Sequence, residues 1–413
     1  MRTALPALRV ALLPAAVSLA VLLAACDRSP GPGEASDAAR SVTQAADAAQ
    51  SRPDESAEPS GDKPILIGHF ASMTGSEATW GVSVDTGIRM AVQEANAAGG
   101  VHGRPLKVIT YDNQGKQQES ATAVTRLITQ DKVVAVLGEV ASSRSIAGGQ
   151  VAQRFGVPMI SPSSTNPRVT EIGDMVFRVC FIDPFQGYVC AKFAREHLNL
   201  TRAATLFNRA QAYSTGLNDA FRKHFSEMGG TIVTEQAYGD GDSDFSAQLT
   251  NIRDARPEII FIPGYYTEVV NIAVQARRLG ITAPLLGGDG WDAEDLKNAG
   301  SALDDCYFSN HYSHEEQRPA VQDFVKRYQA EFGKIPDGMA ATGYDAAGIL
   351  IDAMRRARSL SGPDLAAAIA QTRDFPGVTG IISMDAQRNA RKPAVILKLK
   401  NGRPSYVTTI SPP

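Results

Sequence analysis

The histidines and carboxylates of this sequence do not assemble into a recognisable catalytic or metal-binding motif. There is no G-x-S-x-G nucleophile elbow, no G-x-x-x-x-G-K-[ST] phosphate loop, no H-E-x-x-H zinc motif and no complete G-x-G-x-x-G. His311 and His314 stand beside Glu315 and Glu316, but no further His or Cys lies at ligand spacing. We therefore interpret this segment as a solvated loop. The sequence predicts a protein that is not an enzyme and that uses no metal or cofactor.

Polar residues at the ends of apolar segments are better candidates for binding chemistry. Ser142 and Ser143 follow an apolar run and open a helical segment. Free N–H groups and the helix dipole favour an anion at such a place, although Ser142 could instead simply cap the helix. Asp289 follows another short apolar run in a glycine-rich loop. It either faces a ligand cleft or serves as a turn residue.

Short apolar strands alternate with amphipathic helices along most of the chain. Strands are expected at 65–70, 106–111, 133–137 and 157–160, and again at 203–207, 231–234, 259–262 and 284–286. Helices separate them, three more follow between 320 and 371, and the tail from 380 to 410 is strand-rich. This rhythm predicts an α/β protein with two doubly wound parallel-sheet lobes. A ligand would bind in the cleft between the lobes, at the carboxyl ends of the strands.

Composition excludes several other classes of protein. The 413 residues carry a formal net charge of −3 and no Lys/Arg block, so nothing indicates nucleic-acid binding. Four cysteines are too few for a disulfide-stapled mini-domain. Cys180 and Cys190 could close a disulfide loop of about ten residues, or both could be buried free thiols. Cys306 would then be an odd, buried thiol.

The N-terminal segment has the pattern of an export signal. Arg2 and Arg9 begin it, and an apolar stretch from 10 to 23, too short for a membrane span, ends in Leu23-Ala24-Ala25-Cys26. These last four residues resemble the lipobox of bacterial lipoproteins, which implies lipidation of Cys26 after removal of residues 1–25. The alternative is an ordinary signal peptide cleaved before Cys26. Residues 26–63 are poor in large apolar side chains, which predicts a disordered tether.

Seven segments in order resemble the leucine/isoleucine/valine-binding protein family of type I periplasmic binding proteins. They are Met73-Thr74-Gly75 with Trp80-Gly81, Gly138-Glu139-Val140-Ala141-Ser142-Ser143, Ile160-Ser161-Pro162-Ser163-Ser164-Thr165-Asn166-Pro167, Phe177-Arg178 with Gln186-Gly187, Gln211-Ala212-Tyr213, Gly264-Tyr265-Tyr266-Thr267-Glu268, and Gly287-Gly288-Asp289-Gly290. The resemblance implies two lobes joined by three crossovers that close on a ligand as a hinge. The first lobe would comprise 64–182 and 312–376, and the second 183–311 and 377–413.

The resemblance also implies roles for individual residues. Ser142, Ser163 and Thr165 would bind a ligand carboxylate through hydroxyls and backbone amides. Asp289 would face the ligand ammonium, in a position where many members have the longer Glu. Tyr213, Tyr265 and Trp80 would cover the ligand, with Trp80 standing where Tyr is frequent.

Together these features predict a lipid-anchored, monomeric periplasmic protein. It would be the solute-binding component of an ABC importer for an amino acid, branched-chain or aliphatic, and would dock on permease subunits in the inner membrane. Whether the anchor lies in the inner or the outer membrane stays open. The alternative from a different class is a sensor of an amino acid or small carboxylate that reports to a receptor rather than to a permease.

Overall fold

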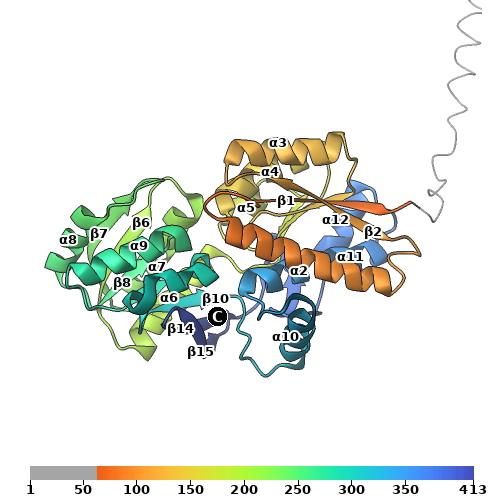
Figure 1. Cartoon of the computed structure of the whole chain (residues 1–413). Helices are drawn as coiled ribbons and strands as arrows, with labels where there is room; N and C mark the ends of the chain where they lie inside the picture. The colour runs from red at the N-terminus through yellow and green to blue at the C-terminus, as the bar shows by residue number, and fades with distance from the viewer. Residues whose placement is uncertain (1–62) are drawn as a thin grey trace, which may run out of the picture. The chain divides into compact units, whose positions relative to one another are not determined.

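The computed structural model describes residues 63–413. The predicted signal peptide, the lipidation site Cys26 and nearly all of the predicted tether lie outside the described residues. The described part contains two large sheets and one small one (Figure 1). Within residues 63–413, no helix is long and apolar enough to cross a membrane.

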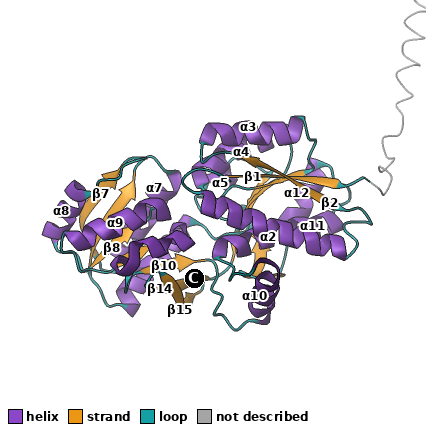
Figure 2. Ribbon diagram, viewed as in Figure 1, coloured by secondary structure: helices purple, strands orange, loops and turns teal. Residues whose placement is uncertain are grey.

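The first lobe is built on a parallel sheet of five strands in the order β2-β1-β3-β4-β5. The strands are β1 (Ile65–Ala71), β2 (Leu106–Asp112), β3 (Ala135–Leu137), β4 (Met159–Ser161) and β5 (Val176–Arg178). The helices of this lobe are α2 (Ala78–Ala97), α3 (Gln117–Thr129), α4 (Ser142–Phe155), α5 (Arg168–Glu171), α10 (Pro319–Phe332), α11 (Gly338–Arg356) and α12 (Gly362–Ala370). Helices lie on both faces of the sheet (Figure 2), and for this reason a strand such as β3 is apolar and buried throughout.

The second lobe is built on a sheet of seven strands in the order β15-β14-β10-β9-β8-β6-β7. Its parallel strands are β6 (Arg202–Asn208), β7 (Thr231–Tyr238), β8 (Ile259–Ile262), β9 (Leu285–Gly287) and β10 (Tyr307–Asn310); β14 (Ala394–Lys400) and β15 (Arg403–Ile410) are antiparallel. Its helices are α6 (Asp183–Lys192), the π-helix η1 (Phe193–His197), α7 (Ala212–Glu227), α8 (Ser246–Ala255), α9 (Tyr266–Arg278) and the 3₁₀ segments η2 (Asp289–Trp291) and η3 (Glu294–Leu303). The predicted α/β class with two parallel-sheet lobes is confirmed.

Helices α2 and α11 are distant in the sequence but run side by side (Figure 1). Glycines allow this close approach: a Cβ atom on Gly87 would lie 2.0 Å from Ala340 O, and one on Gly343 would lie 2.6 Å from Val84 O. Asp337 caps α11 by accepting a hydrogen bond from Ala340 N. The chain after the second lobe therefore returns to complete the first.

The position of the last crossing differs from the sequence-based prediction at Pro376-Gly377. A small antiparallel sheet of β11 (Phe375–Gly377), β12 (Gly380–Met384) and β13 (Ala390–Arg391) follows α12. It stays with the first lobe, where Arg178 N donates to Arg388 O at 3.2 Å. The chain joins the seven-stranded sheet only at β14. The strand propensity of residues 380–410 predicts extended chain, but propensity does not indicate which sheet a strand joins.

The disulfide proposed between Cys180 and Cys190 is not formed, and the alternative of buried free thiols is what the structure shows. Cys180 Sγ donates to Ser164 O of the first lobe at 3.3 Å. Cys190, on α6 of the second lobe, has its Sγ 3.5 Å from Gly287 O of the same lobe. Burial raises the pKa of both thiols to about 12, so both are protonated and unreactive.

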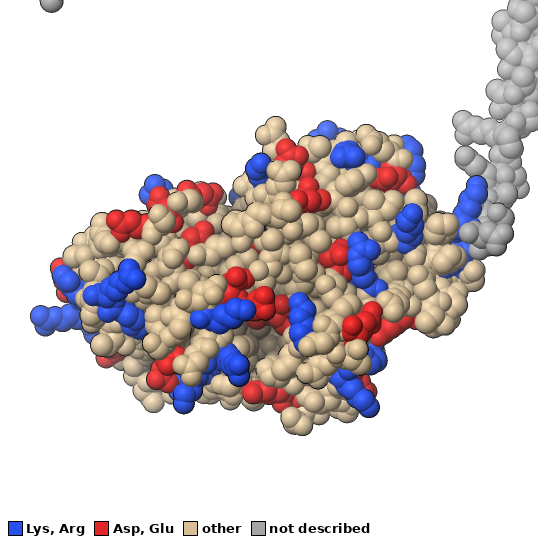
Figure 3. Space-filling model, viewed as in Figure 1, with Lys and Arg blue, Asp and Glu red and all other residues tan. Residues whose placement is uncertain are grey.

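Lysine, arginine and carboxylate side chains are interspersed on the face of the molecule seen in Figure 3, without a large area of one sign. This distribution agrees with the small net charge of the sequence.

Candidate functional site

The two lobes touch each other along the carboxyl ends of their parallel strands. Trp80 Nε1, at the start of α2, donates to Asp292 O at 2.9 Å, and Thr79 Oγ1 donates to Asp295 Oδ2 at 2.6 Å. Tyr266 OH donates to Ser76 O at 2.8 Å. Because each bond joins residues of different lobes, the structure represents a closed arrangement.

On the first lobe, the predicted hydroxyl residues come together beside the N-terminus of α4. Ser142 is the first residue of that helix, and its Oγ accepts a hydrogen bond from Asn166 N at 3.2 Å. Ser163 and Thr165 lie in the loop after β4 and are buried, yet neither hydroxyl has a partner among the described residues. A buried hydroxyl without a partner costs about 1–3 kcal/mol. Such a pair indicates a place for a polar ligand group.

The buried guanidinium of Arg178 fixes the shape of that loop. Its Nη1 donates to Ser164 O at 2.6 Å and its Nη2 to Asn166 O at 2.8 Å. These bonds turn the carbonyl groups of the loop towards Arg178. The positions of the Ser163 and Thr165 side chains are thus fixed by the backbone of the loop and not by hydrogen bonds of their own hydroxyls.

On the second lobe, Asp289 begins η2 directly after β9 and is buried. Its Oδ1 accepts from Gln186 Nε2 at 2.8 Å and from Tyr213 OH at 3.0 Å, and its Oδ2 lies 2.9 Å from His311 Nε2. Burial lowers the pKa of His311 to about 4, so the neutral ring donates its Nε2 proton to the carboxylate. The carboxylate of Asp289 therefore already accepts hydrogen bonds from three protein donors.

Glycine in the 287–290 loop makes this arrangement possible. A Cβ atom on Gly288 would lie 2.4 Å from Tyr213 OH and 2.9 Å from Gln186 Nε2. The interpretation of His311 as part of a solvated loop is wrong: its side chain is buried and paired with Asp289. Within residues 63–413 there is no group of His, Cys, Asp and Glu that could hold a metal ion.

Asp183 is a buried acidic residue near these groups that the sequence analysis did not single out. It opens α6, is fully buried, and neither carboxylate oxygen has a hydrogen-bond partner among the described residues. Burial raises its pKa to about 8, and the charge of Asp289 acts in the same direction; the polar side chains of Thr165 and Asn166 beside the carboxyl group act against both by favouring its ionised form. Across from it, a Cβ atom on Gly216 would lie 3.1 Å from Oδ2. In the sequence, Asp183 reads only as an ordinary acidic residue at a helix start.

The three predicted aromatic residues form one continuous wall. The rings of Trp80 and Tyr265 meet edge to face with centroids 4.8 Å apart, and those of Tyr213 and Tyr265 stack at 5.4 Å. Tyr266 packs on the other side of Trp80 at 5.0 Å. All four are buried. Because the indole N–H is committed to Asp292 O, Trp80 presents only its apolar ring surface to the neighbouring tyrosines.

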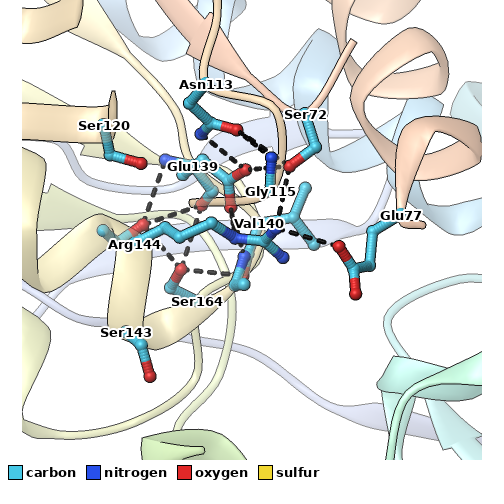
Figure 4. Close-up of polar contacts among 12 residues, drawn as sticks. Ser72, Glu77, Asn113, Gly115, Ser120, Glu139, Val140, Ser143, Arg144 and Ser164 are labelled. Carbon is cyan, nitrogen blue, oxygen red and sulfur yellow. Dashed lines mark hydrogen bonds and ion pairs between the residues drawn. The ribbon is translucent and has the colours of Figure 1, made fainter. Parts of the chain in front are cut away.

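Arg144 forms a second polar centre that the sequence analysis missed (Figure 4). Its Nε lies 3.2 Å from Glu139 Oε2, and its Nη1 donates to Glu77 Oε2 at 3.0 Å and to Ser72 Oγ at 2.9 Å. Burial alone would lower the pKa of Arg144, but the charges of Glu139 and Glu77 outweigh it and hold that pKa above the usual value. The cluster is part of the wall of a cavity of about 370 Å³ between the lobes, to which Tyr265 also contributes.

The site thus offers hydroxyl donors and a helix N-terminus on one lobe, carboxylates on the other and an aromatic wall between them. This arrangement suits a small molecule with an anionic and a cationic end, enclosed when the lobes meet.

These features define a two-lobed α/β binding protein. Residues 64–403 match the family described as periplasmic binding protein, and the chain belongs to that family. The "Amino acid binding protein" of Pseudomonas aeruginosa is 32% identical over 233 residues, which cover 56% of this chain. The matched segment spans 62% of that relative, less than two thirds of its length.

Two solved structures match over nearly their whole length. The leucine binding protein LivK of Thermotoga maritima is 38% identical, with a TM-score of 0.80 over 84% of this chain and 99% of that one. The branched-chain amino acid transporter substrate binding protein LivJ of Streptococcus pneumoniae, solved with isoleucine, is 33% identical, with a TM-score of 0.80 over 85% of this chain and 100% of that one. The predicted relationship to the leucine/isoleucine/valine-binding proteins is confirmed.

Proposed function

We propose that the protein is the solute-binding component of an ABC importer and that it encloses one α-amino acid between its lobes. One observation carries the proposal: two unpartnered hydroxyls, on Ser163 and Thr165, lie on the first lobe, and an unpartnered carboxylate, Asp183, opens the second. A zwitterionic amino acid supplies the missing partner to both sides.

The ligand carboxylate would lie at the N-terminus of α4, with Ser142, Ser163 and Thr165 around it. The ammonium would lie between Asp183 and Asp289. Asp183 receives the principal contact, since Asp289 already accepts three hydrogen bonds. This refines the expectation, drawn from resemblance, that Asp289 faces the ammonium alone. Asp289 would also hold Tyr213 in place over the ligand.

The ligand side chain would pack against Trp80, Tyr213 and Tyr265. An aliphatic, branched-chain side chain is favoured because the LivK and LivJ relatives are described as binding leucine and branched-chain amino acids. The description of LivJ as a transporter substrate binding protein also favours import over sensing.

The location and the anchor are part of the same proposal. Membership of the periplasmic binding protein family supports a periplasmic location. Lipidation of Cys26 would attach the protein to a membrane through its tether, because two acyl chains suffice for stable anchoring. The protein would then act as a monomer that presents its closed lobes to permease subunits.

A thermal-shift screen of the purified protein against the 20 common amino acids tests the ligand class. A true ligand at 100 times its Kd stabilises the protein by about 2.7 kcal/mol. We expect leucine, isoleucine or valine to give the largest shift, and titration calorimetry to give one site per chain. No stabilisation by any amino acid would contradict the proposal.

A further inference from the structure

A second cavity of about 370 Å³ lies at the segments that connect the two lobes. One wall is the chain just after β10, including His311, and the other is the chain from β12 to the start of β14, including Thr379 and Lys392. Of its lining residues, His311 also contacts the proposed amino-acid site, through Asp289.

Lys392 is the principal charged group of the cavity. It is 2% exposed, and its Nζ donates to Thr379 Oγ1 at 2.5 Å, whose hydroxyl in turn donates to Asp345 Oδ2 at 2.6 Å. Burial lowers the pKa of Lys392 to about 8, against the attraction of Asp345, so the ammonium is still largely protonated at pH 7. An ammonium has three donors, and Thr379 takes one of them. Two N–H groups remain for a ligand.

The other polar groups around the cavity favour an anion over a cation. Arg391 is exposed and Arg318 is partly buried, and both contribute to the cavity wall. Arg318 Nη2 is held by Val378 O at 2.7 Å and by the nearby Glu316, the one acidic residue of the cavity wall. Arg391 Nη2 donates to Pro413 O at 3.0 Å. The cavity wall itself thus contains three cationic side chains and one carboxylate, while Asp345 lies behind Thr379 as the buried counter-charge of Lys392.

His311 adds an acceptor to these donors. Its Nε2 proton is donated to Asp289, so Nδ1 is an unprotonated acceptor; it is buried and has no partner within residues 63–413. Ile381, Pro393 and Val395 supply apolar surface. A matching ligand therefore needs a carboxylate for Lys392, a hydroxyl to donate to Nδ1, and a short apolar body. An amino acid matches less well, because its ammonium, in the place of the hydroxyl, would add a positive charge to a cavity whose wall already contains Lys392, Arg318 and Arg391.

We propose that this cavity binds a small 2-hydroxy carboxylic acid with an aliphatic body, as a site separate from the cleft. The carboxylate contacts Lys392 and Arg391, and the hydroxyl donates to His311 Nδ1. The ligand would touch two of the segments that connect the lobes.

Calorimetry of the purified protein with 2-hydroxyisovalerate tests the proposal, with two matched probes. Isovalerate lacks the hydroxyl and 2-hydroxyisovaleramide lacks the charge. We expect 2-hydroxyisovalerate to bind and each of the other two to bind at least about tenfold more weakly, because each leaves a buried polar group unpaired. Equal binding of isovalerate or of the amide, or no binding of the acid up to 50 mM, would overturn the proposal.

Variants locate the site. Lys392→Met should weaken 2-hydroxyisovalerate binding at least about tenfold, whereas Lys398→Met, which replaces a lysine on β14 outside the cavity, should leave it unchanged. Arg391→Gln changes an exposed residue and should weaken binding severalfold, so it tests the site even if Lys392→Met fails to fold. Thr165→Val, in the cleft, should abolish amino-acid binding and leave the hydroxy acid unaffected. Loss of hydroxy-acid binding in Thr165→Val would place it in the cleft and refute a second site.

Discussion

Replacing Asp183 by Asn should make the ligand-free protein more stable and at the same time remove its affinity for amino acids. The substitution keeps the shape of the side chain and removes its charge. In the wild type the carboxyl group is fully buried and both its oxygens lack partners. The structure therefore predicts opposite effects on folding and on binding.

The size of the stability change follows from the pKa of the group. Its ordinary value of 3.8 is raised to about 8 in the folded protein, by burial first and by Asp289 as a further contribution. The folded state thus holds a proton that the unfolded state releases between these values, so stability falls as the pH rises from about 4 to 8. About three pH decades separate 3.8 from 7, each worth roughly 1.4 kcal/mol, which gives a cost on the order of 4 kcal/mol at pH 7.

An asparagine avoids that cost. Its amide and the protonated carboxyl group of the wild type are both buried polar groups, so their desolvation costs largely cancel. The net gain for Asp183→Asn should thus be on the order of 4 kcal/mol at pH 7 and should fall below about 1 kcal/mol near pH 4, where the wild type is largely protonated in both states. Binding should weaken at least about 30-fold, because the ammonium loses its charged partner.

Urea denaturation at pH 4, 5.5 and 7 measures the first effect, and titration calorimetry with the best amino acid measures the second. Asp219→Asn on the exposed surface of α7 is the matched control and should change stability by less than about 0.5 kcal/mol. Wild-type binding at pH 7 should release close to one proton, measurable in buffers of different ionisation enthalpy. A variant that binds within threefold of wild type, or that is destabilised equally at all three pH values, would refute the role of Asp183.

Three further expectations concern other parts of the site and the anchor. Asp289→Asn should weaken amino-acid binding and also lower stability by about 1–3 kcal/mol, because the amide NH2 group cannot accept a hydrogen bond from the donors that now face the carboxylate; calorimetry and urea denaturation check both, and unchanged stability would contradict the network. Trp80→Phe should lose the bond to Asp292 O and favour the open lobes, so small-angle scattering should show that more ligand is needed to reach the compact form than in wild type. Cys26→Ser should release the protein from membranes without changing ligand affinity; a variant that stays with the membrane fraction would contradict lipidation as the anchor.

The strand-and-helix rhythm was sufficient to predict the fold and part of the site. Ser142 and Asp289 could be found as candidates because each lies within the first five residues after a strand, and the carboxyl ends of parallel strands meet at one edge. Arg144 and Asp183 could not, because nothing local distinguishes a buried titratable side chain from a solvated one in the same helical turn. Arg144 is paired with Glu77, 67 residues away in the sequence, and Asp183 is buried by tertiary packing that the local sequence does not reveal.

The burial of polar groups without partners also explains why a ligand should favour the closed arrangement. The hydroxyls of Ser163 and Thr165 and the carboxyl group of Asp183 are all removed from water when the lobes meet, and none gains a partner within the described residues. At about 1–3 kcal/mol for each group, their desolvation opposes closure by several kcal/mol. The bonds from Thr79, Trp80 and Tyr266 across the lobes act in the opposite direction, at about 1 kcal/mol each. A zwitterion that satisfies all three groups binds the closed form far more tightly than the open one, and this difference in affinity is what a ligand requires to shift the lobes.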